Sequence, residues 1–314
     1  MFPLSSLLKS FVQVGRLTVI DAAGQRHVYS GRPGLDVTMQ LTDASLYRKL
    51  FLNPELHAGE AYMDGGLVIE RGSLYQFLAL MTRNLHHFMP RRGLFGWLRP
   101  KNPRAAARRN AAHHYDLSAA FYRLFLDADM QYSCAYFTGP GMSLEEAQAA
   151  KKRHLAAKLL IEPGHRVLDI GAGWGGLALT LAGEHGAQVL GVTLSSEQLD
   201  AARQRAAALG LERAVRFELR DYRDVEGKFD RIVSVGMFEH VGPAHYDAFL
   251  GAVARLLDAR GVAVLHTIGR MDGPGGGNAW IEKYIFPGGT IPALSQLIAG
   301  VERSGLILAD VEVL

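Results

Sequence analysis

The chain has 314 residues, enough for about two domains. Its 48% hydrophobic and 21% charged residues are those of a folded globular protein, which excludes disordered, collagen-like and coiled-coil classes. The single cysteine, Cys134, excludes an internal disulfide and fits a reducing, cytoplasmic setting. The sequence contains no run of about 18 apolar residues, the length that a helix needs to span a bilayer. The first residues lack the basic region and cleavage pattern of a secretory signal.

The net charge of +3 conceals a strongly basic segment. No acidic residue occurs between Glu70 and Asp116, and this stretch carries nine Lys or Arg residues, so the rest of the chain sums to −6. Apolar residues such as Trp97 interleave with the charges, and several Pro and Gly residues argue against a long helix. The residues alone favour a solvated linker, and leave open a contact with anionic lipid or with nucleic acid.

Residues 1–89 are predicted to form a small α+β domain. Apolar residues at helical spacing predict a helix within residues 2–12, and short strands are expected over 16–20 and 26–29. A second helix is predicted over 74–85. No motif in this part carries obvious chemistry.

Residues 90–109 are expected to be a basic linker, and 110–314 a second domain in which strand-like and helical runs alternate. Strands are predicted over 167–170, 189–192, 215–218, 231–235, 262–265 and 307–314, with helices over 177–181, 198–209, 246–257 and 294–304. This alternation predicts an α/β fold with a mostly parallel, doubly wound sheet. Ligands of such sheets bind beyond the carboxyl ends of the strands.

A glycine-rich loop follows the first of these strands. Residues 171–176 fit the pattern G-x-G-x-x-G, which lets the backbone approach a ligand closely. Asp169, just before the loop, suits the amino-acid part of S-adenosylmethionine. A dinucleotide site would want an acidic residue at the end of the second strand, and the first acid there is Glu197. The sequence therefore favours S-adenosylmethionine, with Gln198 as the nearest ribose partner and a glycine turn without ligand as the alternative.

Two ionisable residues follow neighbouring strands at the same edge. Glu239 comes after the fourth strand and His266 after the fifth, beside the predicted cofactor loop, which indicates catalysis rather than packing. Two ligands without a third make a poor zinc site, so we expect no metal. Residues 110–116 and 131–137 are rich in aromatic and polar side chains. They are interpreted as a lid, with a helical cap packed on the sheet as the alternative.

Several longer motifs follow one another in order. They are H-Y-D at 114–116, Q-Y-S-C-A-Y-F at 131–137, L-D-I-G-A-G-W-G-G at 168–176, F-D-R-I-V-S-V-G-M-F-E-H-V-G at 229–242 and L-H-T-I-G at 265–269. On these motifs the chain resembles the cyclopropane-fatty-acyl-phospholipid synthase family of S-adenosylmethionine-dependent lipid methyltransferases, from about residue 110 onward. G-E-A-Y-M-D-G at 59–65 resembles the N-terminal domain of the longer bacterial members.

The resemblance implies a class I methyltransferase fold with a helical lid, and transfer of a methylene group to a cis double bond of a phospholipid acyl chain. The resulting carbocation would be deprotonated by a bound bicarbonate ion. The resemblance places Glu239, His266, Cys134 and Ile268 around the bicarbonate, the last two mainly through their backbone. With the loop residues added, the expected cofactor site comprises Tyr132, Ser133, Asp169, Gly171, Gly173, Gly175, Thr193, Leu194, Gln198, Tyr222 and Arg223.

A lipid substrate changes the interpretation of the basic segment. Residues 90–109 are then expected to touch the inner face of the membrane from the cytoplasmic side, with no nucleic acid as partner and a homodimer as an allowed assembly. The family continues past the position of Leu314 with a segment whose tyrosine helps hold bicarbonate, so we expect a truncated domain with little activity. The alternatives are a fatty-acyl methyltransferase with a methyl-branched or methylidene product, a non-catalytic lipid-binding homologue, and a methyltransferase for a soluble molecule.

Overall fold

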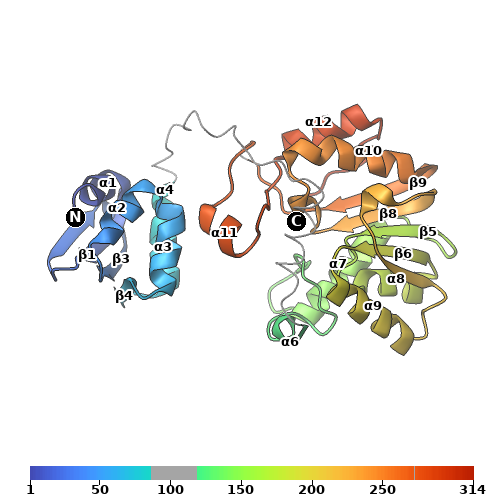
Figure 1. The fold of residues 1–314 in the computed structure, drawn as a ribbon, viewed down its shortest axis with the longest axis horizontal. Coiled ribbons are helices and arrows are strands. Elements are labelled where there is room, and N and C mark those ends of the chain that lie inside the picture. Colours follow the sequence, from blue (N-terminus) through green and yellow to red (C-terminus); the bar gives the residue numbers. More distant parts are fainter. Residues whose placement is uncertain (86–118, 272) are drawn as a thin grey trace. The chain divides into compact units, whose positions relative to one another are not determined.

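The structure, a computed structural model, describes residues 1–85, 119–271 and 273–314 (Figure 1). Contacts divide these residues into two compact units: 1–85 with 278–285, and 119–277 with 286–314. The predicted basic linker, 90–109, and the H-Y-D motif lie outside the described residues, as do the domain boundaries predicted at either end of the linker.

The first unit is a small α+β domain. Its elements are α1 (Leu4–Phe11), β1 (Val14–Ile20), β2 (Arg26–Ser30), β3 (Arg32–Leu41), α2 (Ser45–Leu52), α3 (Pro54–Met63), β4 (Leu67–Arg71), α4 (Leu74–Leu85) and α11 (Ala279–Tyr284). The strands form a sheet in the order β2-β1-β3-β4, in which β1 is antiparallel to β2 and parallel to β3. Asn84, fully buried, fastens α4 to the start of β1 by accepting from the Gln13 and Val14 amides and donating to the Val14 carbonyl.

Helix α11 belongs to this first unit although it is distant from it in sequence. Glu60 on α3 accepts hydrogen bonds from Lys283 Nζ at 2.6 Å and from the Tyr284 hydroxyl at 2.9 Å. Gly59 leaves room for the Trp280 ring, since an added Cβ would lie 2.4 Å from it. These contacts hold the pKa of Glu60 down to about 2, with Lys283 as the largest cause.

The second unit is an α/β domain. Its elements are α6 (Ala119–Tyr122), α7 (Leu144–Lys158), β5 (Arg166–Ile170), α8 (Gly176–His185), β6 (Gln188–Thr193), α9 (Ser196–Ala208), β7 (Val215–Leu219), β8 (Phe229–Val235), α10 (Tyr246–Leu256), β9 (Leu257–His266) and α12 (Leu294–Ser304), with short 3₁₀ turns at Tyr222–Asp224, Phe238–His240 and Pro243–His245. Within the described residues its sheet has the order β7-β6-β5-β8-β9, with every pairing parallel. The order reverses between β5 and β8, the point at which ligands of such sheets bind.

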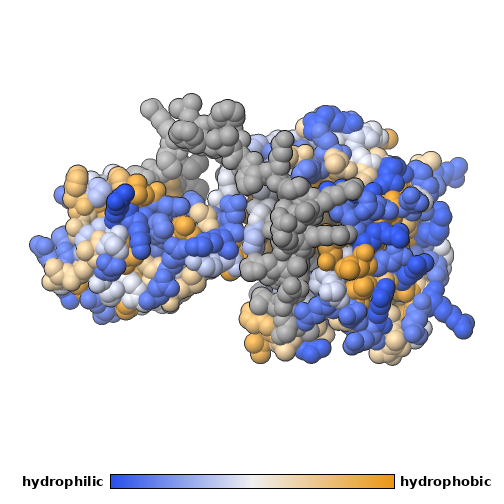
Figure 2. All heavy atoms as spheres, in the orientation of Figure 1, coloured by the Kyte–Doolittle hydropathy of each residue, from blue (hydrophilic) through white to orange (hydrophobic). Residues whose placement is uncertain are grey.

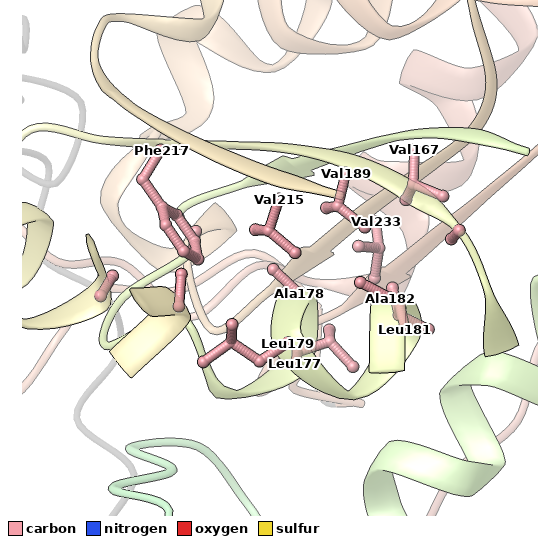
Figure 3. Close-up of a cluster of buried hydrophobic side chains, with 14 of the residues drawn as sticks. Val167, Leu177, Ala178, Leu179, Leu181, Ala182, Val189, Val215, Phe217 and Val233 are labelled. Carbon is pink, nitrogen blue, oxygen red and sulfur yellow. The ribbon is translucent and has the colours of Figure 1, made fainter. Parts of the chain in front are cut away.

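Helices cover both faces of this sheet, as the alternating pattern predicts (Figure 1). Because successive strand residues point to opposite faces, Val167 packs with α7, α8 and α9, whereas Leu168 packs with α10 and α12. Figure 3 shows the first of these clusters, with Val189, Val215 and Val233 facing the side chains of α8. The two apolar cores fix the strand ends that carry the polar residues described below.

The predicted strand at 307–314 was wrong, because these residues form no strand. Side chains hold the segment instead: Glu312 accepts from His154 at 2.8 Å and pairs with Lys158 at 2.7 Å, and Asp310 also pairs with Lys158. An alternating apolar pattern becomes a strand only where a neighbouring backbone offers hydrogen bonds. The apolar residues of the segment, such as Ile307, are exposed.

Apolar side chains reach the surface of both units in patches among hydrophilic ones (Figure 2). One patch lies at α6, where Phe121, Leu124 and Phe125 are 44%, 80% and 48% exposed. Within the described part of the chain, no helix is long and apolar enough to cross a membrane.

Candidate active site

A cavity opens at the carboxyl ends of β5, β6 and β8, where the sheet order reverses. Ten of the eleven residues expected at the cofactor site line it: Tyr132, Ser133, Asp169, Gly171, Gly173, Thr193, Leu194, Gln198, Tyr222 and Arg223. The eleventh, Gly175, lies outside the lining. It caps α8 with a φ of +83°, and an added Cβ would lie 2.7 Å from the buried Phe217 ring. Gly175 is therefore a packing and turn residue.

The glycine loop presents its backbone to this cavity. The amides of Gly171 and Ala172 both donate to the Val192 carbonyl, at 2.9 and 3.0 Å, which ties the loop to the end of β6. Gly171 has a φ of +85°, and a Cβ there would lie 2.9 Å from Met237. Only glycine fits both the backbone conformation and the space.

Asp169 brings a buried carboxylate to the cavity wall from β5. Its side chain is 2% exposed, and its Oδ2 has no hydrogen-bond partner among the described residues. Burial raises the pKa of Asp169 to about 7. A buried acid with an unpartnered oxygen fits a ligand that brings a cation or a donor of its own.

Polar side chains at the end of β6 form a short hydrogen-bonded chain. The Thr193 hydroxyl donates to Gln198 Oε1 at 2.9 Å, and the Ser195 hydroxyl caps α9 by accepting from the Gln198 amide. Gln198 is 5% exposed, and its side-chain nitrogen can donate toward the cavity. This supplies the polar partner that an acidic residue provides in other nucleotide sites.

The next strand end contributes an aromatic ring and an ion pair. Asp221 accepts from Arg223 Nε at 2.8 Å and Nη2 at 2.5 Å, and this pairing raises the pKa of Arg223. The Arg223 guanidinium lies 5.6 Å from the centre of the Tyr222 ring. The pair holds the Tyr222–Arg223 segment at the cavity wall.

Aromatic side chains pack over the glycine loop. The Tyr122 ring lies 5.6 Å from Trp174 and 5.3 Å from Tyr132, and Tyr122 and Trp174 are both buried. Burial, assisted by Tyr132, raises the pKa of the Tyr122 hydroxyl to about 12, so it keeps its proton. This cluster supports the interpretation of the segment before the sheet as a cover for the loop.

Glu239 and the end of β9 meet at the same edge of the sheet. Glu239 Oε1 accepts from the Ile268 amide at 2.7 Å, while Oε2 is buried with no partner in the described chain. His266 lies in register with Val235 of β8, and its buried Nδ1 likewise lacks a partner there. Burial raises the pKa of Glu239 and lowers that of His266, which favours the neutral form of each.

Cys134 follows the two cavity residues Tyr132 and Ser133, and its side chain is exposed. The structure joins Glu239 to Ile268 by a hydrogen bond and places His266 at the neighbouring strand end, whereas Cys134 makes no hydrogen bond to these residues within the described chain. Among the described residues, no group of three His, Cys, Asp or Glu side chains could hold a metal ion.

Several functional residues escaped the sequence analysis. Asp221, which pairs with Arg223, directly precedes the predicted site residue Tyr222, and Trp174, whose ring packs with Tyr122, lies inside the glycine loop. A third is Lys151 on α7, whose Nζ donates to Ser133 Oγ at 2.6 Å. Helical spacing could have indicated that Lys151 is buried, because it shares one buried face of the helix with Ala147 and Leu155.

Comparison with known proteins identifies this arrangement. The family model described as mycolic acid cyclopropane synthetase matches residues 102–314. A probable fatty acid methyltransferase of Pseudomonas putida is 47% identical over 209 residues, 64% of this chain and 53% of its own length. The cyclopropane-fatty-acyl-phospholipid synthase of Escherichia coli K12 is 39% identical over 271 residues, 84% of this chain and 69% of its own length.

A solved structure shares the fold. The crystal structure of mycolic acid cyclopropane synthase CmaA1 with SAH and CTAB superposes with a TM-score of 0.60 at 36% identity, over 65% of this chain and 76% of that one. This confirms the predicted class I methyltransferase fold. The present chain spans about half the length of one curated relative and about two thirds of another. By its family model and these relatives, the chain belongs to the mycolic acid cyclopropane synthetase family of S-adenosylmethionine-dependent methyltransferases.

Proposed function

We propose that this protein transfers a methylene group from S-adenosylmethionine to a cis double bond of a phospholipid acyl chain, as a cyclopropane-fatty-acyl-phospholipid synthase. One observation carries the proposal. Glu239 and His266, both half-buried, present buried and unpartnered polar atoms at the same sheet edge as a glycine-loop cavity. A cofactor site beside a site for a base is what alkylation followed by ring closure requires.

The cofactor cavity fits S-adenosylmethionine by its donor set. The cofactor supplies an electrophilic methyl group on a sulfonium. Asp169 Oδ2 would accept from the amino group of the cofactor, and Gln198 would donate to a ribose hydroxyl. Tyr222 and Arg223 would line the adenine end. These contacts bind and orient the cofactor, because an alkene is a weak nucleophile and reacts only with a methyl group held close and in line.

The second half of the reaction needs a base. Methyl transfer leaves a carbocation on the acyl chain, and loss of a proton from the new methyl group closes the ring. A bound bicarbonate ion would supply the base. Burial raises the pKa of Glu239, and in its protonated form it can donate from Oε2 to an anion; neutral His266 can donate from Nδ1 when the proton resides there. The Ile268 amide holds Glu239 in place.

Water must be kept from the carbocation. The buried Tyr122 and Trp174 rings pack over the glycine loop and exclude water there. Aromatic faces also stabilise cations, so this cover suits the reaction in two ways.

The substrate lies in a membrane, so the enzyme must reach its surface. We propose that residues 90–109, with their excess of Lys and Arg, make a peripheral contact with anionic lipid on the cytoplasmic face. Binding to vesicles rich in anionic lipid that weakens with added salt would support this contact. Equal binding to neutral vesicles would contradict it.

The decisive experiment is mass spectrometry of lipids from cells that express this chain. We expect monounsaturated acyl chains to gain the mass of one methylene group and then to resist hydrogenation, as a ring does. An unchanged lipid profile, with vesicle binding intact, would favour a non-catalytic lipid-binding homologue.

A second candidate is a fatty-acyl methyltransferase with a methyl-branched or methylidene product. The name of the Pseudomonas putida relative, a probable fatty acid methyltransferase, favours it. Both reactions pass through the same carbocation. Loss of a proton from the new methyl group either closes the ring or, after a hydride shift along the chain, leaves a methylidene group; loss of a proton from a neighbouring chain carbon leaves a methyl-branched alkene. A product of the same added mass that takes up hydrogen would identify one of these unsaturated compounds, and fragmentation of the acyl chain would tell the methylidene from the methyl branch. A saturated methyl branch would be two hydrogens heavier and would need a separate hydride donor.

A further inference from the structure

A buried lysine, Lys151, contacts a segment that lines the cavity. Helix α7 begins with a capping box formed by Ser143 and Glu146, which fixes its start and therefore its facing. Lys151 lies on the buried face of this helix and is 2% exposed. A lysine this deeply buried is costly, because its ammonium loses its hydration.

The partners of Lys151 are neutral acceptors on one segment. Its Nζ donates to Gln131 Oε1 at 2.9 Å and to Ser133 Oγ at 2.6 Å. One turn earlier, Gln148 Nε2 donates to the carbonyls of Gln131 and Ser133, at 3.2 and 3.0 Å. Helix α7 thus fastens residues 131–133, which line the cavity and lead into Cys134.

Nearby acids only partly offset the charge of Lys151. Asp127 and Asp129 attract it, but Asp129 is already paired with Lys152 at 2.6 Å and with Arg205. Burial, reinforced by Lys152, lowers the pKa of Lys151 to about 8.

The segment that Lys151 holds lies beside the end of β9. A Cβ added at Gly236 would lie 3.6 Å from Ser133 Cβ, and the Gly236 amide donates to the His266 carbonyl at 3.0 Å. Burial, and after it the charge of Lys151, lowers the pKa of His266. Glu239, a second titratable group at this sheet edge, accepts from the Ile268 amide two residues after His266.

We propose that Lys151 is a positioning residue, whose buried ammonium holds residues 131–133 beside the ends of β8 and β9 and attracts an anion to the site of Glu239 and His266. The role of the anion as base rests on the proposed function, whereas the effect on His266 does not. Lys151 does not itself line the cavity. It acts through Ser133 and through its field.

The test is a titration of His266 by NMR in the whole chain. The signal of His266 among the 12 histidines is assigned by its loss in His266→Gln. In Lys151→Met, an unbranched side chain one atom shorter that removes the charge, we expect the pKa of His266 to rise by about one unit. In Lys151→Arg, which keeps the charge, it should stay near the wild-type value.

The matched control is Arg153→Met, which removes a charge from the exposed face of the same helix. It should leave the pKa of His266 unmoved. An unmoved His266 in folded Lys151→Met, or an equal rise in the control, would overturn the proposal. If Lys151→Met does not fold, Lys151→Gln retains a donor for Ser133 and tests the same loss of charge.

Potassium bicarbonate is the probe for the second readout. The bicarbonate concentration for half-maximal turnover should rise about tenfold in Lys151→Met, with the KM for S-adenosylmethionine changed far less. In the wild type it should also rise as the pH passes about 8, where Lys151 loses its proton. If the pKa of His266 rises in Lys151→Met but the wild type transfers no methylene group, the proposed function is refuted and the role of Lys151 stands. If the wild type transfers methylene groups but the pKa of His266 is the same in Lys151→Met, the role of Lys151 is refuted and the proposed function stands.

Discussion

The two halves of the site are built by different means. The cofactor half is mostly backbone: a glycine loop tied to β6, one unpartnered carboxylate and a short hydrogen-bonded chain. The proposed base half depends on ionisable side chains: burial raises the pKa of Glu239, and burial together with the charge of Lys151 lowers the pKa of His266. A substitution of one side chain leaves contacts made by the backbone in place, but it removes the function of an ionisable side chain. Mutations in the base half should therefore lower turnover while they leave the affinity for the cofactor nearly unchanged.

The largest expected difference between binding and turnover is in Glu239→Gln. The amide keeps the shape and the Oε1 acceptor for Ile268 but cannot exchange a proton. We expect turnover to fall by about a hundredfold or more, with the affinity for the cofactor changed less than about threefold. Single-turnover kinetics and calorimetry measure the two quantities. Glu302→Gln, on an exposed part of α12, is the control. A parallel loss of binding and turnover would make Glu239 a structural residue.

On the cofactor half the largest effect is expected from Asp169→Asn. The wild-type carboxylate, neutral below about pH 7, ionises when a cationic amino group approaches. At pH 8 the affinity for S-adenosylhomocysteine should therefore fall about tenfold in the variant, and this difference should shrink as the pH drops below 7. Titration calorimetry from pH 6 to 8 checks this.

The sign of the pH effect on stability follows from the same pKa. The pKa of Asp169 is raised on folding from 3.8, so the folded state binds the proton more tightly and loses stability as the pH rises toward 7. Asp169→Asn should then unfold at an equal or higher temperature than the apo wild type at pH 8. The exposed Asp200→Asn on α9 is the control. A lower unfolding temperature, with pH-independent binding, would contradict the account.

The sequence predicted the α/β unit well, because its strands are short apolar runs set between amphipathic helices and glycine turns. The first unit was harder. β3 begins with Arg-Pro-Gly, which breaks a strand pattern, and α3 has almost no apolar face, so neither was predicted. The segment 307–314 shows the converse, since it has a strand-like pattern but lies against α7 through Asp310 and Glu312.

The sequence predicted those residues of the candidate site that lie just after the strands of the sheet. Ten predicted cofactor residues line the cavity because parallel strands bring their carboxyl ends together. The contribution of Lys151 lies on a helix far from any motif and acts across a tertiary contact. The spacing of residues within the helix could not show which buried groups Lys151 contacts.

The smallest expected effect tests whether the cofactor half tolerates loss of a side-chain contact. Thr193→Val is nearly isosteric and removes the hydroxyl that donates to Gln198 Oε1 at 2.9 Å. A neutral hydrogen bond contributes about 1 kcal/mol, so the affinity for S-adenosylhomocysteine should fall only about threefold to tenfold, with turnover at saturation unchanged.

A double-mutant cycle shows whether this contact acts through Gln198. In a Gln198→Ala background, Thr193→Val should have no further effect on affinity, because the hydroxyl acts by orienting the Gln198 amide toward the cavity. Additive losses would mean that Thr193 contacts the cofactor directly. A fall in saturated turnover would mean that the end of β6 also positions the reacting groups, and the division of the site into a binding half and a chemical half would then fail.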